Sequence, residues 1–442
     1  MSLIKRLEEI NVDKKCNKPE EKEADPYFEL KTKIQNRVIE ELDIDFNDIS
    51  DQNQELREAI NFIVMKQIEQ ESLNMTTNQK KKIKEELLDE IIGFGPITAL
   101  LADKSVTEIM VNGPNHVYVE RDGKLVLTDA KFKNDNHVMH VIKKIVAPIG
   151  RRIDESSPMV DARLPNGSRV NAIIPPLAID GPSITIRKFA EDPFKVEDLI
   201  NFGTLSSKMA ELLKYCVEAR LNIVVSGGTG SGKTTTLNVL SSFIPESERI
   251  VTIEDAAELQ LSQIHVVRLE TRPANIEGKG EVNIRDLVKN SLRMRPDRII
   301  IGEVRSGETL DMLQAMNTGH DGSLTTGHAN SPRDMLSRLE TMVLMSGMNL
   351  PIKAIRDQTA SAIDLIIQQS RLIDGSRRIT HITEVQGMEG DVIILQDIFK
   401  FEQKGLDTKR KVKGEYVFTG IMPKFLEKFK ERGINIPAGI FI

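Results

Sequence analysis

The feature that most constrains this chain is a glycine-rich run directly after an apolar stretch. Residues 221–225 read Leu-Asn-Ile-Val-Val, and residues 227–235 read Gly-Gly-Thr-Gly-Ser-Gly-Lys-Thr-Thr. This is the spacing of a Walker A loop, G-x-x-x-x-G-K-[ST], which connects a strand to a helix. Backbone N–H groups of such a loop, and the N-terminus of the helix after it, cradle phosphate oxygens. The run therefore predicts a nucleoside triphosphate site, the alternative being an ordinary glycine-rich turn.

Each residue of the loop has an expected role. Lys233 is expected to contact the β- and γ-phosphates, and the Thr234 hydroxyl to bind Mg²⁺. The other residues expected around the phosphates are Gly228, Thr229, Gly230, Ser231, Gly232 and Thr235. ATP and Mg²⁺ are the predicted cofactors.

Composition limits the classes of function. The 442 residues suffice for two or three domains, and the net charge of −6 argues against a nucleic-acid machine. The two cysteines, Cys16 and Cys216, provide neither a disulfide framework nor a cysteine-based zinc site, and Cys216 has the helical spacing of a core residue. No apolar run reaches the ~18–20 residues of a membrane span, and the N-terminus does not resemble a signal peptide. We therefore expect a cytoplasmic protein with peripheral membrane contact at most.

Four regions follow from the pattern along the chain. They are a flexible charged tail (1–33), a bundle of about three helices (34–92), an α+β domain (93–192) and an α/β domain (193–442). In the last region, apolar runs at 221–226, 250–254, 298–302, 323–326 and 364–369 alternate with helical patterns near 233–242, 285–294, 307–316, 332–345 and 352–362. This alternation predicts a mostly parallel sheet with helices on both faces. Residues 377–401 predict a β-rich tail with a hairpin at 389–391.

Carboxylates follow two of the predicted strands. Glu303 ends the run 298–302, and we expect it to hold the attacking water or a Mg²⁺-bound water; a solvated strand-end residue is the alternative. The position before it is Gly302, where an ordinary Walker B strand has Asp. Glu254 ends the run 250–254, and Asp255 follows it. We expect these carboxylates to hold a Mg²⁺-bound or catalytic water, with helix capping by Asp255 as the alternative.

Histidines and arginines complete the candidate site. His320 and His328 flank the run 323–326. His328 follows a predicted strand and is expected to sense the γ-phosphate or to order Glu303, and for each histidine a structural donor role is the alternative. Arg163 and Arg169 flank a Pro-Asn-Gly turn, and Arg187 ends another predicted strand. Arginine offers a bidentate fork for phosphate, although surface ion pairing is the alternative.

Taken together, these motifs resemble those of the secretion-superfamily ATPases, the motors of type II and type IV secretion, pili and archaella. The Walker A loop is followed by Thr-Ile-Glu-Asp (252–255), Gly-Glu-Val-Arg (302–305) and a histidine box (318–329), which resemble the Asp box, atypical Walker B and His box of that superfamily. Residues 88–96, 106–113 and 150–158 look like the CpaF-type subgroup, which drives Tad (tight adherence) pilus assembly. The resemblance covers about residues 85–400.

The resemblance implies a RecA-like motor domain preceded by the α+β domain, assembled as a homohexamer with nucleotide between the two domains. It implies phosphate contacts for Arg163, Arg169 and Arg187, and catalytic roles for His320 and His328 beside Glu303, Glu254 and Asp255. It also implies inner-membrane platform proteins as partners, with peripheral membrane association through them. The acidic net charge, rather than the resemblance, argues against a stable nucleic-acid complex. A nucleotide-switched binding module and a DNA-translocating motor remain as alternative hypotheses.

Overall fold

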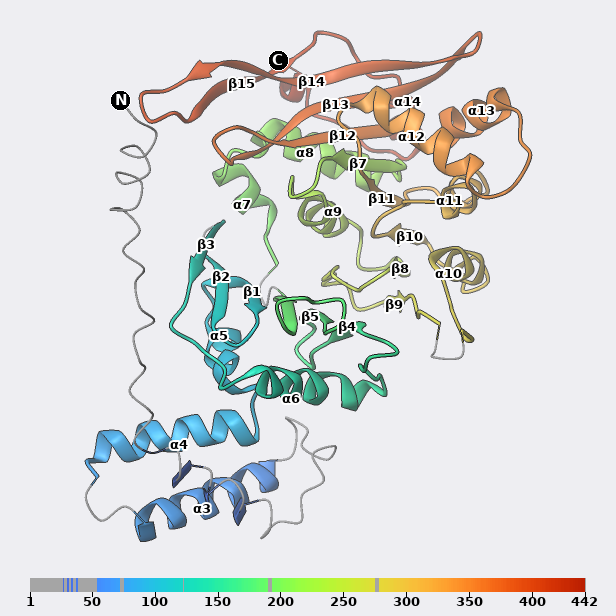
Figure 1. Ribbon diagram of the computed structural model, residues 1–442. Helices are drawn as coiled ribbons and strands as arrows, with labels where there is room; N and C mark the ends of the chain where they lie inside the picture. The colour runs from blue at the N-terminus through green and yellow to red at the C-terminus, as the bar shows by residue number, and fades with distance from the viewer. Residues whose placement is uncertain are drawn as a thin grey trace, which may run out of the picture. The chain divides into compact units, whose positions relative to one another are not determined.

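The computed structural model describes residues 27, 30–31, 33–34, 37–38, 54–71, 75–121, 123–189, 193–274 and 278–441. The chain divides into two compact units, Met1–Phe189 and Ala190–Ile442, called here the N-terminal and C-terminal units (Figure 1). Almost all of the predicted tail (1–33), including Cys16, lies outside the described residues.

The N-terminal unit begins with a helical cluster. Helices α3 (Gln54–Glu71) and α4 (Thr77–Ile91) pack together with Ile34 and Val38 around one apolar core. The α4 helix begins with a capping box, since the Gln79 side chain accepts from the Thr76 N–H at 2.9 Å and Thr76 Oγ1 accepts from the Gln79 N–H at 3.3 Å. Thr76 is therefore the N-cap of this helix.

An antiparallel sheet of six strands forms the rest of this unit, in the order β3-β2-β1-β6-β5-β4. Its strands are β1 (Val106–Asn112), β2 (His116–Arg121), β3 (Lys124–Leu127), β4 (Met159–Arg163), β5 (Arg169–Ile173) and β6 (Ser183–Arg187). Helix α6 (Asp135–Val146) covers it with an apolar stripe, and the short segments η1 (Gly95–Ile97), α5 (Thr98–Ala102) and η2 (Ala147–Ile149) complete the unit.

Polar contacts join α4 to α6 within the N-terminal unit. Glu90 lies 3.0 Å from Lys133 Nζ and 3.1 Å from His137 Nε2. Burial raises the pKa of Glu90, but the hydrogen bonds and charges of His137 and Lys133 outweigh burial and lower it to about 2. Lys144 Nζ donates to two carbonyls at the C-terminal end of α4, both at 2.7 Å. The cation therefore satisfies carbonyls that the helix itself leaves unpaired.

The C-terminal unit contains a sheet of nine strands in the order β15-β14-β13-β12-β7-β11-β10-β8-β9. The strands are β7 (Ile223–Gly227), β8 (Ile250–Glu254), β9 (Val266–Glu270), β10 (Arg298–Ile301), β11 (Leu324–Gly327), β12 (Leu365–Arg371), β13 (Arg377–Glu389), β14 (Val392–Leu406) and β15 (Val412–Phe418). The six from β12 to β9 are parallel, and β13, β14 and β15 continue antiparallel. The five predicted parallel strands and the hairpin at 389–391 are confirmed, whereas β9, β15 and the extension of β14 beyond residue 401 were not predicted.

Helices cover both faces of this sheet. Within β7, Ile223 and Val225 join one apolar core while Val224 joins the other, because alternate strand residues point to opposite faces. Helices α8 (Ser207–Glu218) and α9 (Lys233–Ser241) contribute to the first core. Helices α10 (Ile284–Ser291), α11 (Glu308–Asn317), α12 (Pro332–Leu344) and α13 (Ile352–Ala362) contribute to the second. The unit also contains α7 (Val196–Asn201), α14 (Leu426–Glu431) and η3 (Ala438–Phe441).

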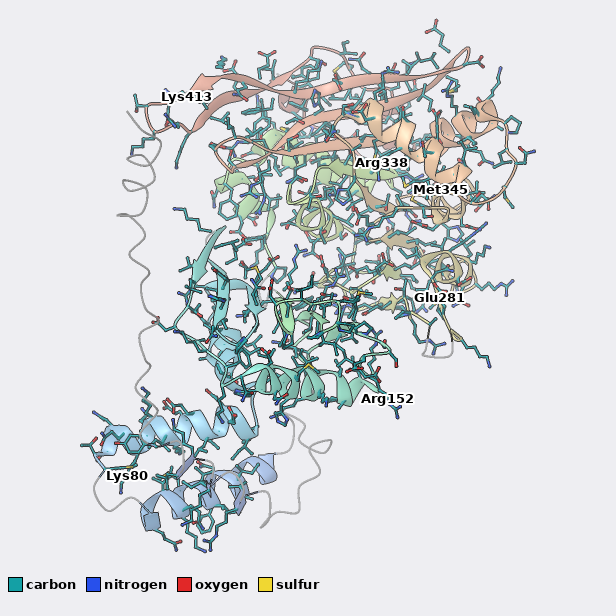
Figure 2. All side chains as sticks on the ribbon, viewed as in Figure 1. Lys80, Arg152, Glu281, Arg338, Met345 and Lys413 are labelled. Atoms are coloured by element: carbon teal, nitrogen blue, oxygen red, sulfur yellow. The ribbon has the colours of Figure 1, made fainter. Side chains whose placement is uncertain are left out.

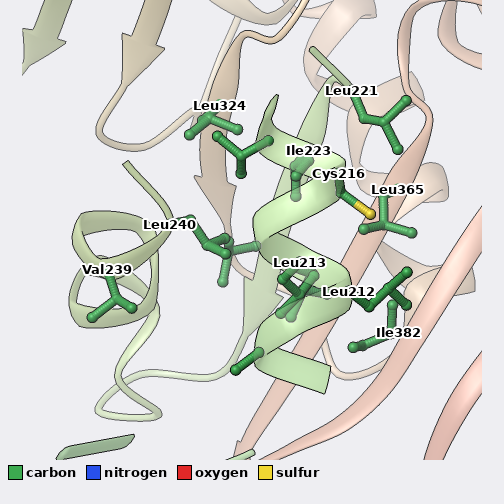
Figure 3. Packing of buried hydrophobic residues seen from close by; sticks show 14 of the residues in the cluster. Leu212, Leu213, Cys216, Leu221, Ile223, Val239, Leu240, Leu324, Leu365 and Ile382 are labelled. Atoms are coloured by element: carbon green, nitrogen blue, oxygen red, sulfur yellow. The ribbon is translucent and has the colours of Figure 1, made fainter. Parts of the chain in front are cut away.

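Cys216 lies in the first core, as its spacing predicts. Figure 3 shows it among Leu212, Leu213 and Leu365, and it is completely buried. Burial raises the pKa of the Cys216 thiol well above its usual value, which makes it an inert core side chain. Among the described residues, none of the helices is long and apolar enough to cross a bilayer.

Candidate active site

The loop between β7 and α9 has the backbone of a phosphate cradle. Gly230 and Gly232 have φ angles of 70° and 96°, in the left-handed region that favours glycine. A Cβ added to Gly227 would lie 2.3 Å from the carbonyl oxygen of Gln369. Glycine is therefore required here by backbone conformation and by close packing, and Gly232 starts α9 as its N-cap.

The Lys233 side chain connects the loop to the neighbouring strand β11. Its Nζ donates to the carbonyl of Gly228 at 3.1 Å and lies 3.3 Å from Nδ1 of His328, which follows β11. Burial lowers the pKa of Lys233, and the negative charge of Glu303 opposes this effect. Burial and then the charge of Lys233 lower the pKa of His328, so its ring is neutral at pH 7 and Nδ1 can accept from Lys233.

Glu303 follows β10 and is held by two neighbours. Its side chain is only 17% exposed, so it is not a solvated strand-end residue. Arg305 Nε donates to Oε2 at 2.7 Å. Oε1 lies 2.7 Å from His328 Nε2, but this contact lacks hydrogen-bond geometry, and the buried Oε1 has no donor among the described residues. One carboxylate oxygen is thus fixed by a hydrogen bond. The other is buried without a donor, and it is called here the open oxygen because it can still accept a hydrogen bond.

These features fit Mg²⁺-bound ATP. The glycine backbone and Lys233 can hold phosphate oxygens, and Thr234 is the hydroxyl residue at the start of α9. The open Oε1 of Glu303 is a buried acceptor of the kind that holds an attacking or metal-bound water.

The packing of Glu254 explains the glycine before Glu303. A Cβ on Gly302 would lie 2.8 Å from Cγ of Glu254, which comes from the adjacent strand β8. The buried Glu254 side chain therefore fills the space next to Gly302, where an ordinary Walker B strand carries Asp. Its Oε2 accepts from the N–H groups of Glu258 and Leu259 at 2.8 and 3.1 Å. Glu254 thereby holds the loop after β8 in place.

Asp255 belongs to the same edge of the sheet but lies on its surface. Its Oδ2 is 3.7 Å from Arg305 Nη1, so Arg305 bridges Asp255 and Glu303. No helix follows Asp255 in the described loop 255–265, and the alternative of helix capping by this residue is wrong. The sequence motif includes Arg305 but predicts no role for it, and in the structure this side chain contacts Glu303.

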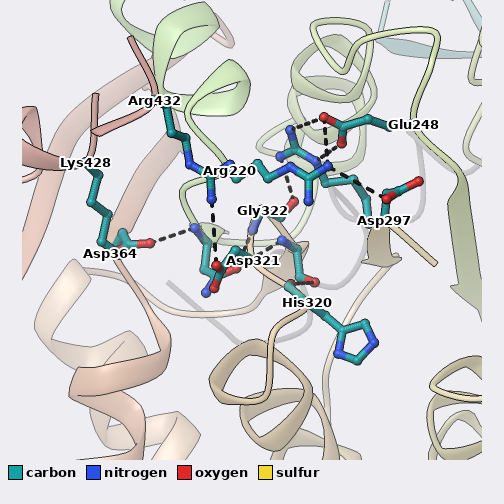
Figure 4. Close-up of polar contacts among 12 residues, drawn as sticks. Arg220, Glu248, Asp297, His320, Asp321, Gly322, Asp364, Lys428 and Arg432 are labelled. Carbon is teal, nitrogen blue, oxygen red and sulfur yellow. Dashed lines mark hydrogen bonds and ion pairs between the residues drawn. The ribbon is translucent and has the colours of Figure 1, made fainter. Parts of the chain in front are cut away.

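His320 does not join this cluster. Strands β7 and β11 are parallel, with Leu324 opposite Ile223 and Gly327 opposite Ser226. The phosphate loop and His328 follow the Gly327 end, while His320 precedes the Leu324 end, ~13 Å away along the strand at about 3.3 Å per residue. Figure 4 shows His320 near Asp321 and Gly322, with its ring directed away from the polar contacts drawn there. Of the two candidate histidines, His328 therefore lies at the phosphate-loop end of β11 and His320 at the other end.

Three arginines of the N-terminal unit form one row. The predicted hairpin is present, with Arg163 directly opposite Arg169, and Arg169 is opposite Arg187 on the next strand. Residues opposite one another in a sheet share a face, and like charges in that position repel. Arg187 also lies 3.9 Å from Glu108 Oε1 on β1, so the surface ion pairing considered for these arginines is present at this end of the row.

Two functional contacts come from far along the chain and were missed. Arg377 on β13 donates from Nε to the carbonyl of Gly230 at 3.0 Å. Gln369 on β12 accepts from Thr236 Oγ1 of α9 at 2.7 Å. Both residues lie more than 130 positions after the loop they support. No local motif signals such contacts, which arise only from the pairing of β12 with β7.

Replacing Arg377 with Ala is expected to weaken ATP binding about two- to tenfold. The contact with Gly230 holds the phosphate loop, and a net hydrogen bond is worth about 0.5–1.5 kcal/mol. Titration with a fluorescent ATP analogue would measure the Kd, with Arg293→Ala, an exposed arginine of the same unit, as the control. An unchanged Kd in the Arg377 variant would show that the loop holds its shape without this contact.

Comparisons place these features among known proteins. Residues 90–405 match the family described as Type II/IV secretion system protein. The chain is 36% identical over 312 residues to a putative conjugal transfer protein of Mycobacterium tuberculosis (strain ATCC 25618 / H37Rv), covering 69% of this chain and 88% of that protein. It is 31% identical over 344 residues to the type IV secretion system protein VirB11 of Bartonella quintana, covering 70% of this chain and 96% of that protein. Among solved structures, the VirB11 ATPase of the Brucella suis type IV secretion system, in complex with sulphate, is 29% identical, with a TM-score of 0.36 over 65% of this chain and 95% of that one.

Proposed function

Because the chain belongs to the type II/IV secretion system protein family, we propose that it is a Mg²⁺-dependent ATP hydrolase that powers a secretion or pilus-assembly machine. One observation carries this proposal. The open oxygen of Glu303 lies next to His328, and His328 contacts Lys233 of the phosphate loop. A carboxylate poised for water beside a phosphate cradle is an arrangement suited to hydrolysis rather than to binding alone.

In the proposed mechanism, Lys233 and the loop N–H groups hold the phosphates, and Thr234 binds Mg²⁺. When bound, Mg²⁺-ATP would supply the γ-phosphoryl group, with the metal offsetting part of its charge. Glu303 orients water through Oε1, while Arg305 fixes the carboxylate through Oε2. Neutral His328 lies between Lys233 and Glu303, 3.3 Å from the lysine Nζ and 2.7 Å from the carboxylate, so it would keep the phosphate loop and the water-binding group next to each other.

We further propose that the active form is a cytoplasmic homohexamer attached peripherally to inner-membrane platform proteins. Arg163, Arg169 and Arg187 would contact phosphates and neutralise charge that develops during hydrolysis. Hydrolysis would move the N-terminal unit against the C-terminal unit about the segment near Pro193. The resemblance of residues 88–96, 106–113 and 150–158 to the CpaF-type subgroup favours a Tad-type pilus as the machine.

A DNA-translocating motor is a second candidate, favoured by the conjugal-transfer names of similar proteins. The net charge of −6 argues against it. A DNA-binding titration at several salt concentrations distinguishes the two, since a steep fall of affinity with log salt would support DNA transport.

The first test is the native mass of the Glu303→Gln protein with and without Mg²⁺-ATP. The expected result is a nucleotide-stabilised assembly of six 49.6 kDa chains, together with ATP turnover by the unaltered protein. A monomer under both conditions, with no turnover by the unaltered protein, would instead support a nucleotide-switched binding module.

A further inference from the structure

Two turns at one end of the nine-stranded sheet lie side by side. They are the β12–β13 turn with its flanks (371–378) and the β14–β15 turn with its flanks (404–413), called here the paired tips. Strands β12 to β15 pair antiparallel in sequence order, so both turns fall at the same end (Figure 1). The Val412 N–H donates to Asp374 Oδ2 at 2.9 Å and joins one turn to the other. Figure 2 labels Lys413 at this end of the sheet.

The paired tips concentrate positive charge on a chain whose net charge is −6. Five of the ten residues from 404 to 413 are Lys or Arg and one is acidic. All five cations are exposed: Lys404, Lys409, Arg410, Lys411 and Lys413. Lys404 pairs with Glu415 at 2.5 Å, whereas the other four extend from the turn and the start of β15. The companion turn adds the exposed Arg371, whereas Arg377 and Arg378 beside it donate to the carbonyls of Gly230 and Phe202.

The acidic residues of the tips shape the turns. Asp407 Oδ1 accepts from the N–H groups of Lys409 and Lys411, both at 2.8 Å. Asp374 Oδ1 accepts from the hydroxyl and N–H of Ser376 at 2.6 and 3.0 Å. Hydrogen bonds from Ser376, and then from Val412, lower the pKa of Asp374 to about 2, so the carboxylate stays ionised and keeps its donors. Each turn is therefore held by hydrogen bonds to its own Asp side chain, and the cations of the β14–β15 turn point into solvent.

Apolar side chains protrude among these cations. Ile373 is 85% exposed and Leu406 is 49% exposed, and they belong to different tips. Neither tip contains an aromatic residue. Single-stranded nucleic acids bind cationic surfaces that also offer aromatic stacking platforms, which these tips lack. Exposed aliphatic side chains surrounded by Lys and Arg instead match the boundary of an anionic bilayer, where the aliphatic groups meet acyl chains and the cations meet lipid phosphates.

We propose that the paired tips dock directly on an anionic lipid bilayer, with Ile373 and Leu406 entering the headgroup region and the basic side chains contacting lipid phosphates. This contact is separate from any attachment through partner proteins, and it does not depend on hydrolysis. It orients one end of the large sheet toward the membrane surface.

Vesicle flotation of the full chain tests the proposal. Vesicles of phosphatidylcholine with about 30% phosphatidylglycerol, whose surface is negatively charged, would be compared with vesicles of pure phosphatidylcholine. One variant carries Lys409→Gln, Lys411→Gln and Lys413→Gln, and another carries Ile373→Ser and Leu406→Ser. The matched control, Lys353→Gln, Lys424→Gln and Lys430→Gln, removes the same charge from exposed positions outside the tips. Arg377 is left unchanged because it contacts the phosphate loop.

The expected result is binding of the unaltered chain to the anionic vesicles only. Each cation near such a surface raises the vesicle partition coefficient roughly fivefold. The partition coefficient of the tip lysine variant should therefore fall about a hundredfold, while that of the control variant should change little. The Ile373/Leu406 variant should also bind more weakly, with the charge unchanged. Equal loss in the tip and control lysine variants, or no binding by the unaltered chain, would overturn the proposal. Binding of DNA but not of vesicles, lost in the tip lysine variant, would also overturn it and assign the tips to nucleic acid. Equal thermal unfolding of all variants checks that each is folded.

Discussion

Replacing Glu303 with Gln is expected to reduce ATP turnover about 10²–10⁴-fold while ATP binding stays close to that of the unaltered protein. The amide keeps the volume of the side chain, so the buried site beside His328 and Arg305 is still filled. It cannot accept a proton from water as a carboxylate does, and its NH₂ group donates where one of the carboxylate oxygens accepted. The loss should therefore fall on kcat, with little change in the Kd for ATP.

Single-turnover kinetics and a binding titration with a fluorescent ATP analogue measure the two quantities separately. The matched control is Glu281→Gln, an exposed carboxylate of the same unit, labelled in Figure 2. Both measurements should be unchanged in this control. Normal turnover by the Glu303 variant would remove Glu303 from the mechanism and leave the open Oε1 without a catalytic purpose.

The parallel core of the C-terminal unit could be predicted because local signals agree with the final packing. Strand β7, the glycine loop and α9 form one continuous segment whose apolar run, glycines and helical pattern are all visible in sequence. Glu303 could be placed beside the loop for a similar reason, since carboxyl ends of parallel strands meet at one edge of a sheet. The same rule, applied to His320, would have placed it at the opposite edge, because it precedes its strand rather than following it.

Contacts across sequence-distant strands could not be predicted in this way. Arg377 and Gln369 reach the phosphate loop only because β12 pairs with β7 and β13 pairs with β12. The reason for Gly302 is likewise invisible in sequence, since the side chain that excludes a Cβ there is Glu254 of another strand. Strand β15 was missed because its first residues, Val-Lys-Gly-Glu, are mostly exposed and polar and lack the apolar run that marks the buried strands.

Arg298 was treated only as the start of an apolar strand, yet it is the largest fully buried side chain of the described residues. It is the first residue of β10, whereas Glu303 follows the other end of that strand. Nε donates to Glu248 Oε2 at 2.5 Å, Nη2 to the carbonyl of Val217 at 2.9 Å and Nη1 to that of Gly322 at 3.2 Å. Arg220 also contacts Glu248, at 3.2 Å, in the polar network of Figure 4. One guanidinium thus joins α8, β10 and the segment before β11.

Replacing Arg298 with Met is expected to destabilise the C-terminal unit by about 3–5 kcal/mol. Methionine has a similar length and fills the space, so the cost comes from polar groups rather than from a cavity. Glu248 loses its buried partner and keeps only Arg220, while the carbonyls of Val217 and Gly322 lose their donor in a region closed to water. For a unit of this size, such a loss corresponds to roughly a 10 °C fall in Tm.

Thermal unfolding followed by circular dichroism measures the change, with Arg293→Met as the exposed control on the segment leading into the same strand. Glu248→Gln separates charge from contact, since it keeps acceptor capacity at that position but removes the ionic partner of Arg298. If the ion pair dominates, the Glu248 variant should be destabilised nearly as much as the Arg298 variant. If the carbonyl contacts dominate, the Glu248 variant should be destabilised less.

Arg298 and Glu303 lie at opposite ends of β10, so the effects of their replacements on stability should add when the two are combined. A destabilisation below about 1 kcal/mol would mean that Arg220 or water takes over the acceptors of Arg298, and the guanidinium would then not be what holds these three segments together.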